Sequence, residues 1–75
     1  MVSHKYDTFL DVLNKMGYYV VRLTDKEKAI EFIDQNPACV LVSPAMIHRQ
    51  DEEDVLYRLQ GIRPRPKVVG FQSID

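Results

Sequence analysis

Three short runs of β-branched and aromatic residues, at 18–23, 38–42 and 67–71, have the composition of β-strands. Before each run, apolar residues recur at the three- and four-residue spacing of one helix face. Strands that alternate with helices indicate parallel pairing through right-handed crossovers. The sequence therefore predicts a small three-layer α/β domain over residues 1–75, with the order α-β-α-β-α-β.

The limits of the helices follow from local signals. The first helix is predicted from Tyr6, Phe9, Leu10, Leu13 and Met16, with Gly17 as its C-terminal cap. Residues 24–27, TDKE, match a capping box in which the Thr24 hydroxyl accepts from the third amide and Glu27 reaches back. The second helix should end at residues 36–37. Its inward residues are predicted to be Ala29, Ile30, Phe32 and Ile33. The acidic run 51–54 is placed at the start of the third helix, where the helix dipole favours negative charge.

The strands carry information about the faces of the sheet. Residues 38–42 are an almost unbroken apolar run, which predicts a strand covered on both faces in the middle of a parallel sheet. In the run 18–23, Arg22 shares a face with Tyr18 and must reach water, so this face should be only partly covered. We place the second and third helices on one face of the sheet, which leaves the first helix for the other face.

Composition limits the classes of function. The formal net charge is -1, and nucleic-acid binding would require a wider basic face. No apolar run approaches the roughly 20 residues that span a bilayer. Cys39 is the only cysteine, which excludes a disulfide framework and fits a reducing, cytoplasmic location. Cys39 is predicted to be a buried structural thiol, and His4 and His48 without a third ligand make a poor metal site.

The segment 13–46, LNKMGYYVVRLTDKEKAIEFIDQNPACVLVSPAM, resembles the middle of a response-regulator receiver domain, which has a flavodoxin-like (CheY-like) fold. The features shared with receivers are, in order, a helix, a Gly-aromatic pair, a strand, a helix with an inward alanine, a proline, an apolar strand and a functional residue. PKVVGF at 66–71 looks like the fourth strand of a receiver. The resemblance implies a receiver-like domain that lacks the first and last strands.

The resemblance also places the positions that carry receiver chemistry. The phosphoacceptor position falls on Ser43, and the switch hydroxyl falls on Gln72 or Ser73, depending on a shift of one residue. The acidic pair that holds Mg²⁺ would fall before residue 1, and the conserved lysine of the family would fall after Asp75. A serine cannot form an acyl phosphate and needs an adjacent base to attack phosphorus. We therefore expect a pseudo-receiver that is not an enzyme and binds no cofactor or metal.

The missing first strand has a structural consequence. In receivers it lies between the second and third strands, so the runs 18–23 and 38–42 must pair directly or accept a strand from elsewhere. Unpaired edges predict a homodimer or a partner that completes the sheet. By resemblance, this partner is a histidine kinase, a response regulator or a transcription regulator. The candidate interface residues are Tyr6, Tyr18 and Tyr19.

The sequence also contains two other candidate sites and allows one other interpretation of the chain. Arg63, Arg65 and Lys67 form a basic cluster at the amino end of the sheet, where an anion or an acidic partner is the candidate ligand. A crevice at the carboxyl end, near Ser43, Met46 and His48, would suit a small ligand-binding protein or an enzyme. The chain is alternatively one piece of a larger protein that supplies the missing strands.

Overall fold

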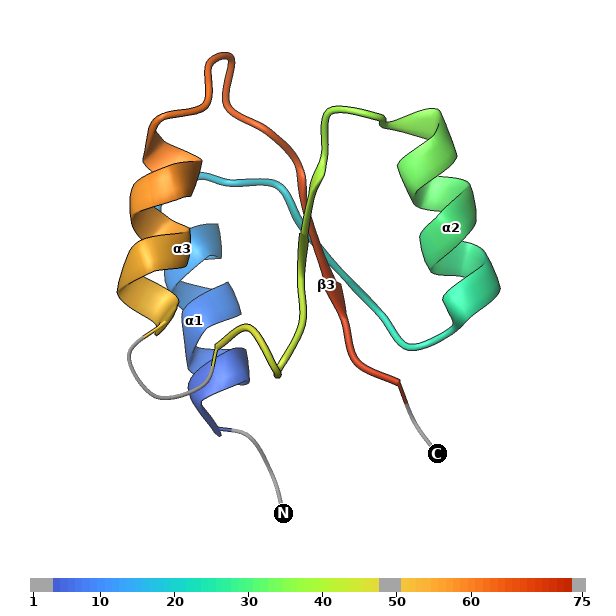
Figure 1. Ribbon diagram of the computed structural model, residues 1–75, viewed down its shortest axis with the longest axis horizontal. Coiled ribbons are helices and arrows are strands. Elements are labelled where there is room, and N and C mark those ends of the chain that lie inside the picture. The colour runs from blue at the N-terminus through green and yellow to red at the C-terminus, as the bar shows by residue number, and fades with distance from the viewer. Residues whose placement is uncertain (1–3, 48–50, 74–75) are drawn as a thin grey trace.

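The computed structural model, which describes residues 4–47 and 51–73, contains the predicted alternation of elements (Figure 1). In chain order the elements are α1 (His4–Lys15), β1 (Val20–Leu23), α2 (Lys26–Gln35), β2 (Val40–Val42), α3 (Asp51–Gln60) and β3 (Val68–Phe71). The predicted small α/β fold, with three helices and parallel strands, is confirmed. Within the described ranges, no helix has the length and apolar character needed to cross a membrane.

The sheet has the order β1-β3-β2, and both pairings are parallel. Val68 of β3 is level with Val20 on one side and with Val40 on the other. The last strand of the chain is thus the central one, and Val68 and Val69 are fully buried. The prediction that residues 38–42 form the middle strand is wrong, because β2 is an edge. The chain's own last strand separates β1 from β2, an arrangement that differs from the receiver order, in which the fourth strand lies outside the third.

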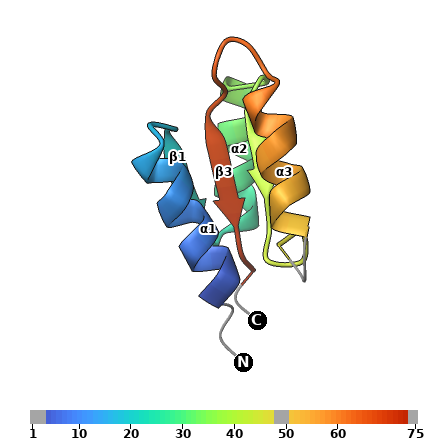
Figure 2. The same ribbon diagram turned by 90° about the vertical axis from the view of Figure 1, so that its left-hand side faces the viewer.

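This strand order decides where the helices lie. The chain crosses the sheet in one direction from β1 to β2 and returns from β2 to β3. Right-handed crossovers in opposite directions place their helices on opposite faces. Figure 2 shows α1 and α3 on the near face of the sheet and α2 on the far face. The prediction that the second and third helices share a face is therefore wrong.

The main core lies between the sheet and the pair of helices α1 and α3. Its buried residues are Tyr6, Phe9, Leu10, Leu13, Tyr18, Val42, Ile47, Leu59 and Val68. Helix α1 approaches the central strand closely at Gly70. A Cβ atom at this position would lie 2.7 Å from both Leu10 Cδ1 and Tyr6 Oη. The absence of a side chain at Gly70 thus allows α1 to pack directly on β3.

Two details of α2 differ from the prediction. Asp25, not Thr24, is the N-cap, and its side chain accepts a 2.9 Å hydrogen bond from the Glu27 amide. Ala29 is buried as predicted, but Ile30 is 50% exposed. The helix ends at Gln35 with Asn36 as its C-cap, within one residue of the predicted end at residues 36–37.

Arg22 reaches solvent around the edge of the sheet. Its guanidinium donates to Asp7 Oδ1 at 2.9 Å and to Asp11 Oδ1 at 3.0 Å, both on α1. On the same face, Val20 is half-buried, and Tyr18, which precedes the strand, is 4% exposed. The expectation of a partly covered face is therefore confirmed, because cover decreases from Tyr18 to the exposed Arg22.

Candidate functional site

The carboxyl end of the sheet brings together the positions that the sequence placed in phosphate chemistry. Because β2 and β3 are neighbours, Ser43 and Ser73 follow adjacent strands. Ser43 is half-buried, and its carbonyl accepts a 3.0 Å hydrogen bond from the Met46 amide. Ser73 and Gln72 are exposed, and the Gln72 amide donates to the Leu23 carbonyl at 3.1 Å. The first side chains after the three strands are thus hydroxyls and an amide, and the acidic Asp25 that follows Thr24 caps α2.

The predicted crevice at this end is described only in part. Met46 is 38% exposed, whereas the next residue, Ile47, is 2% exposed and holds the turn against the core. A cavity of about 250 Å³ is lined by Met46, Asp54, Val55 and Arg58. His48 and the side chain of His4 lie outside the described residues. Within residues 4–47 and 51–73, no three His, Cys, Asp or Glu residues gather in a way that could hold a metal ion.

Arg65, from the predicted basic cluster, is held against α1 at the amino end of the sheet. Its Cζ atom lies 4.5 Å from the centroid of the Tyr18 ring, and its guanidinium donates to the Met16 carbonyl. Gly17 leaves room for this contact, since a Cβ there would lie 2.8 Å from Arg65 Nη1. Gly17 also has a φ of +95°, a conformation that side chains disfavour. Arg65 therefore stabilises the C-terminal end of α1.

Lys67 makes an equivalent contact with α2. Its Nζ atom donates to Asn36 Oδ1 at 2.8 Å and lies 5.5 Å from the centroid of the Tyr19 ring. Asn36 in turn donates through Nδ2 to the Phe32 carbonyl at 3.0 Å. Positive charge is favourable at the C-terminal end of a helix. Two cations of the predicted anion cluster thus fasten the loop before β3 to the ends of two helices.

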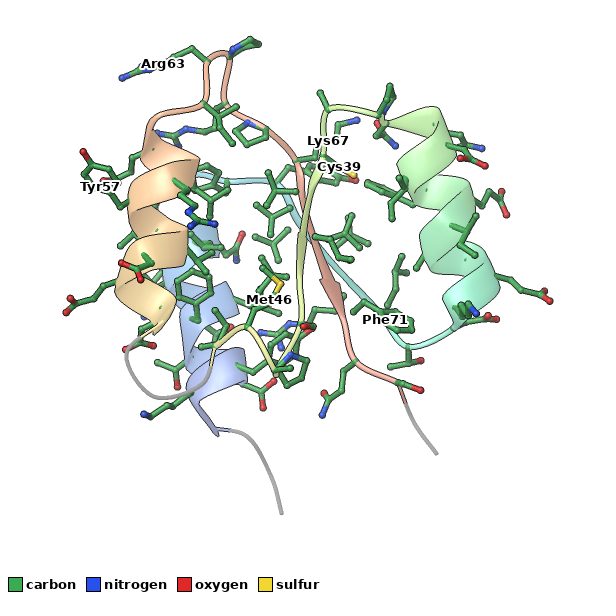
Figure 3. All side chains as sticks on the ribbon, in the orientation of Figure 1. Cys39, Met46, Tyr57, Arg63, Lys67 and Phe71 are labelled. Atoms are coloured by element: carbon green, nitrogen blue, oxygen red, sulfur yellow. The ribbon has the colours of Figure 1, made fainter. Side chains whose placement is uncertain are left out.

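Arg63 stands at the apex of the same loop and is exposed (Figure 3). Among the described residues it makes no hydrogen bond or ion pair. Beside this loop is a cavity of about 420 Å³, bounded by residues 35–39 and 62–67. Of the residues that line it, three are cationic and none is acidic. Cys39 lines it too and is half-buried, not fully buried as predicted. The sequence signalled the cations but not this cavity, because its two walls are distant in the chain.

The candidate interface tyrosines separate in the structure. Tyr6 and Tyr18 are 3% and 4% exposed and belong to the core, whereas Tyr19 is 61% exposed. Burial raises the pKa of the Tyr6 hydroxyl above 10.0, Arg22 lowers it in part, and Asp7 adds to the rise. Tyr57 on α3 is 80% exposed and points away from the body of the molecule (Figure 3). Tyr19 and Tyr57 are thus the tyrosines that offer surface to a partner.

No family model, curated protein or solved structure matches the chain.

Proposed function

We propose that this protein is a non-catalytic, receiver-like interaction module that acts by self-association and by binding a protein partner in signalling or transcription regulation. The observation that carries the proposal is the apolar surface beside β2. Among the described helices, α2 alone lies on its face of the sheet, where it contacts β1 and β3. Leu41 on β2 is consequently 43% exposed, and Ile30 on α2 is 50% exposed. Apolar side chains gathered beside an open strand are typical of interaction sites.

The two edges of the sheet differ in chemistry. Edge strands that stay unpaired are usually protected by charged residues, prolines or bulges. The β1 edge carries Arg22, which is paired with Asp7 and Asp11. The β2 edge is Val-Leu-Val and contains no charged residue. This asymmetry favours β2 as the edge that pairs with another chain.

The chemistry of the carboxyl end supports a role without catalysis. A receiver-type reaction requires a carboxylate to form the acyl phosphate, and Ser43 offers a hydroxyl instead. A serine also requires an adjacent base to become a nucleophile, and within residues 4–47 and 51–73 the Ser43 hydroxyl has no hydrogen bond to one. The resemblance to receivers suggests the class of partner, namely a histidine kinase, a response regulator or a transcription regulator.

Two measurements test this proposal. Sedimentation velocity from low micromolar to near-millimolar protein should show a concentration-dependent dimer, and a monomer throughout would refute self-association. Mass spectrometry after incubation with acetyl phosphate and Mg²⁺ should show no added phosphoryl group. A phosphorylated product that requires Mg²⁺ would refute the non-catalytic role.

The amino-end cavity favours a second candidate function, the binding of a small organic anion. Its walls combine apolar residues such as Pro37 and Ile62 with Arg63 and Lys67. Its volume of about 420 Å³ falls in the range of small-molecule pockets. Calorimetric titration with benzoate should detect saturable binding that weakens in Lys67→Ala and Arg63→Ala. Equal heats from both variants and the unchanged protein would exclude this site.

A further inference from the structure

We propose that the second copy in the self-associated state pairs with β2 in antiparallel orientation, with a two-fold axis between the Leu41 residues of the two copies. This inference rests on the self-association proposed above and specifies its geometry. The two three-stranded sheets would join into one continuous sheet.

The backbone of β2 has free hydrogen-bonding groups on the side away from β3. The Val40 amide donates to the Lys67 carbonyl at 2.9 Å, and Val40 and Val42 are the ladder partners of Val68 and Gly70. Because bonding alternates along a parallel ladder, the N–H and C=O of Leu41 point away from β3. In Figure 1, β2 is the strand nearest the viewer and crosses in front of β3. In an antiparallel ladder, every second pair of opposed residues exchanges both of its N–H···O=C bonds. With a two-fold axis at Leu41, the Leu41 N–H of each copy therefore donates to the Leu41 carbonyl of the other copy.

The residues at the two ends of β2 also suit this register. The Cys39 amide already donates to the Asn36 carbonyl, and the Ser43 carbonyl already accepts from the Met46 amide. In the proposed register, Cys39 lies opposite Ser43 of the second copy. The groups left over are the Cys39 carbonyl and the Ser43 amide, which are complementary. Neither has a partner within the described part of the chain. The turns on either side of β2 thus leave the Cys39 carbonyl and the Ser43 amide free to form the hydrogen bond that this register requires.

The sequence of the β2 edge is self-complementary. Val-Leu-Val is symmetric about Leu41, so Val40 lies opposite Val42 of the second copy. The two Leu41 side chains lie on the same face of the joined sheet and cover each other. A two-fold axis is the most common closed form of self-association and requires a patch that complements itself. This requirement favours a second copy over an unrelated partner at this edge.

The flank of α2 extends the apolar surface on the same face. A cavity between α2 and β1 is lined by Leu23 of β1 and by Lys28, Phe32 and Gln35 of α2. This side of α2 is therefore turned toward β1. Ile30 and Ile33 lie on the opposite side of the helix, which is turned toward β2. Pairing at β2 would therefore bring the half-exposed Ile30 of each copy toward the joined edge.

Helix α3 contributes charges on the other face. Glu52 and Leu56 line a cavity shared with α1, whereas Asp54 and Arg58 line one with Met46 after β2. Asp54 and Arg58 thus occupy the flank turned away from α1. Helix α3 runs antiparallel to β2 (Figure 1). A two-fold axis reverses the second helix, so Asp54 of one copy faces the Arg58 end of the other. In the joined sheet, opposite charges would then face each other.

A disulfide experiment tests the register. Opposed residues of a hydrogen-bonded antiparallel pair have Cα atoms about 5.5 Å apart, within the roughly 4.4–6.8 Å that a disulfide spans. Cys39, Leu41 and Ser43 share one face of the strand. The Ser43→Cys variant, oxidised under native conditions, should therefore form a covalent dimer through Cys39 of the other copy. The dimer should appear on a non-reducing gel.

Two matched controls separate the register from chance oxidation. In the unchanged protein the two Cys39 residues would lie four positions out of register, about 13 Å apart, and should not cross-link. The Cys39→Ser/Ser43→Cys double variant has the same separation and should also stay uncross-linked. Cross-linking of the double variant to the same extent as Ser43→Cys would overturn the proposed register.

Sedimentation distinguishes failure of this geometry from failure of the proposed function. Leu41→Lys places a charge at the axis and should weaken dimerisation at least tenfold, while circular dichroism of the monomer stays unchanged. A dimer that persists in Leu41→Lys, with no covalent dimer in Ser43→Cys, would overturn the geometry and leave self-association standing. A monomer at every concentration of the unchanged protein would overturn both.

Discussion

The packing of α1 on the central strand makes a quantitative prediction at Gly70. In Gly70→Ala, the new methyl group would lie 2.7 Å from Leu10 Cδ1 and 2.7 Å from Tyr6 Oη. Leu10 and Tyr6 are 1% and 3% exposed, so neither can move aside into solvent. Overpacking of this kind costs about 1–3 kcal/mol. Removing a glycine from a strand offsets about 0.5–1 kcal/mol of this cost. From the middle of each range we expect a net loss of about 1 kcal/mol of unfolding free energy.

Thermal and urea denaturation followed by circular dichroism measures this loss. For a domain of this size, each kcal/mol lowers the melting temperature by about 4–8 °C. Gly61→Ala is the matched control, because its Cβ would meet nothing closer than the Arg58 carbonyl oxygen at 3.5 Å. The control should be neutral or slightly stabilising. A Gly70→Ala protein as stable as the control would refute the close approach of α1 to β3.

Three further perturbations test local parts of the fold. Gly17→Ala should destabilise the protein by about 1–2 kcal/mol in urea titrations, because φ is positive and Arg65 occupies the space; no change would contradict the contact. Asp25→Ala should lose about 0.5–2 kcal/mol as the true N-cap of α2. Thr24→Ala should lose less, and the reverse ranking would restore Thr24 as the cap. Folding raises the pKa of Tyr6, so the folded state holds this proton more tightly than the unfolded state. Stability should therefore fall as the pH rises above 10.0, and the fall should be smaller in Tyr6→Phe.

Local patterns were sufficient to predict the elements and their order. Helical spacing of apolar residues, the proline after α2 and the acidic start of α3 act within a few residues. Each therefore leaves its mark in a short stretch of sequence. The contacts of the basic loop could not be predicted in this way. Arg65 and Lys67 reach groups 49 and 31 positions earlier in the chain, and only folding brings them together.

The sequence by itself determined that this chain alternates helices with parallel strands. Tertiary structure decided which strand is central. The apolar run at 38–42 predicted that side chains on both faces of this strand would be covered. Strands pair through backbone hydrogen bonds in the plane of the sheet, and side-chain hydrophobicity does not indicate how many neighbours a strand has in that plane. Once β3 lies between β1 and β2, right-handed crossovers send α2 and α3 to opposite faces. The same strand order makes β2 an edge strand and leaves Leu41 exposed on it. The proposed interaction site is therefore a consequence of strand order.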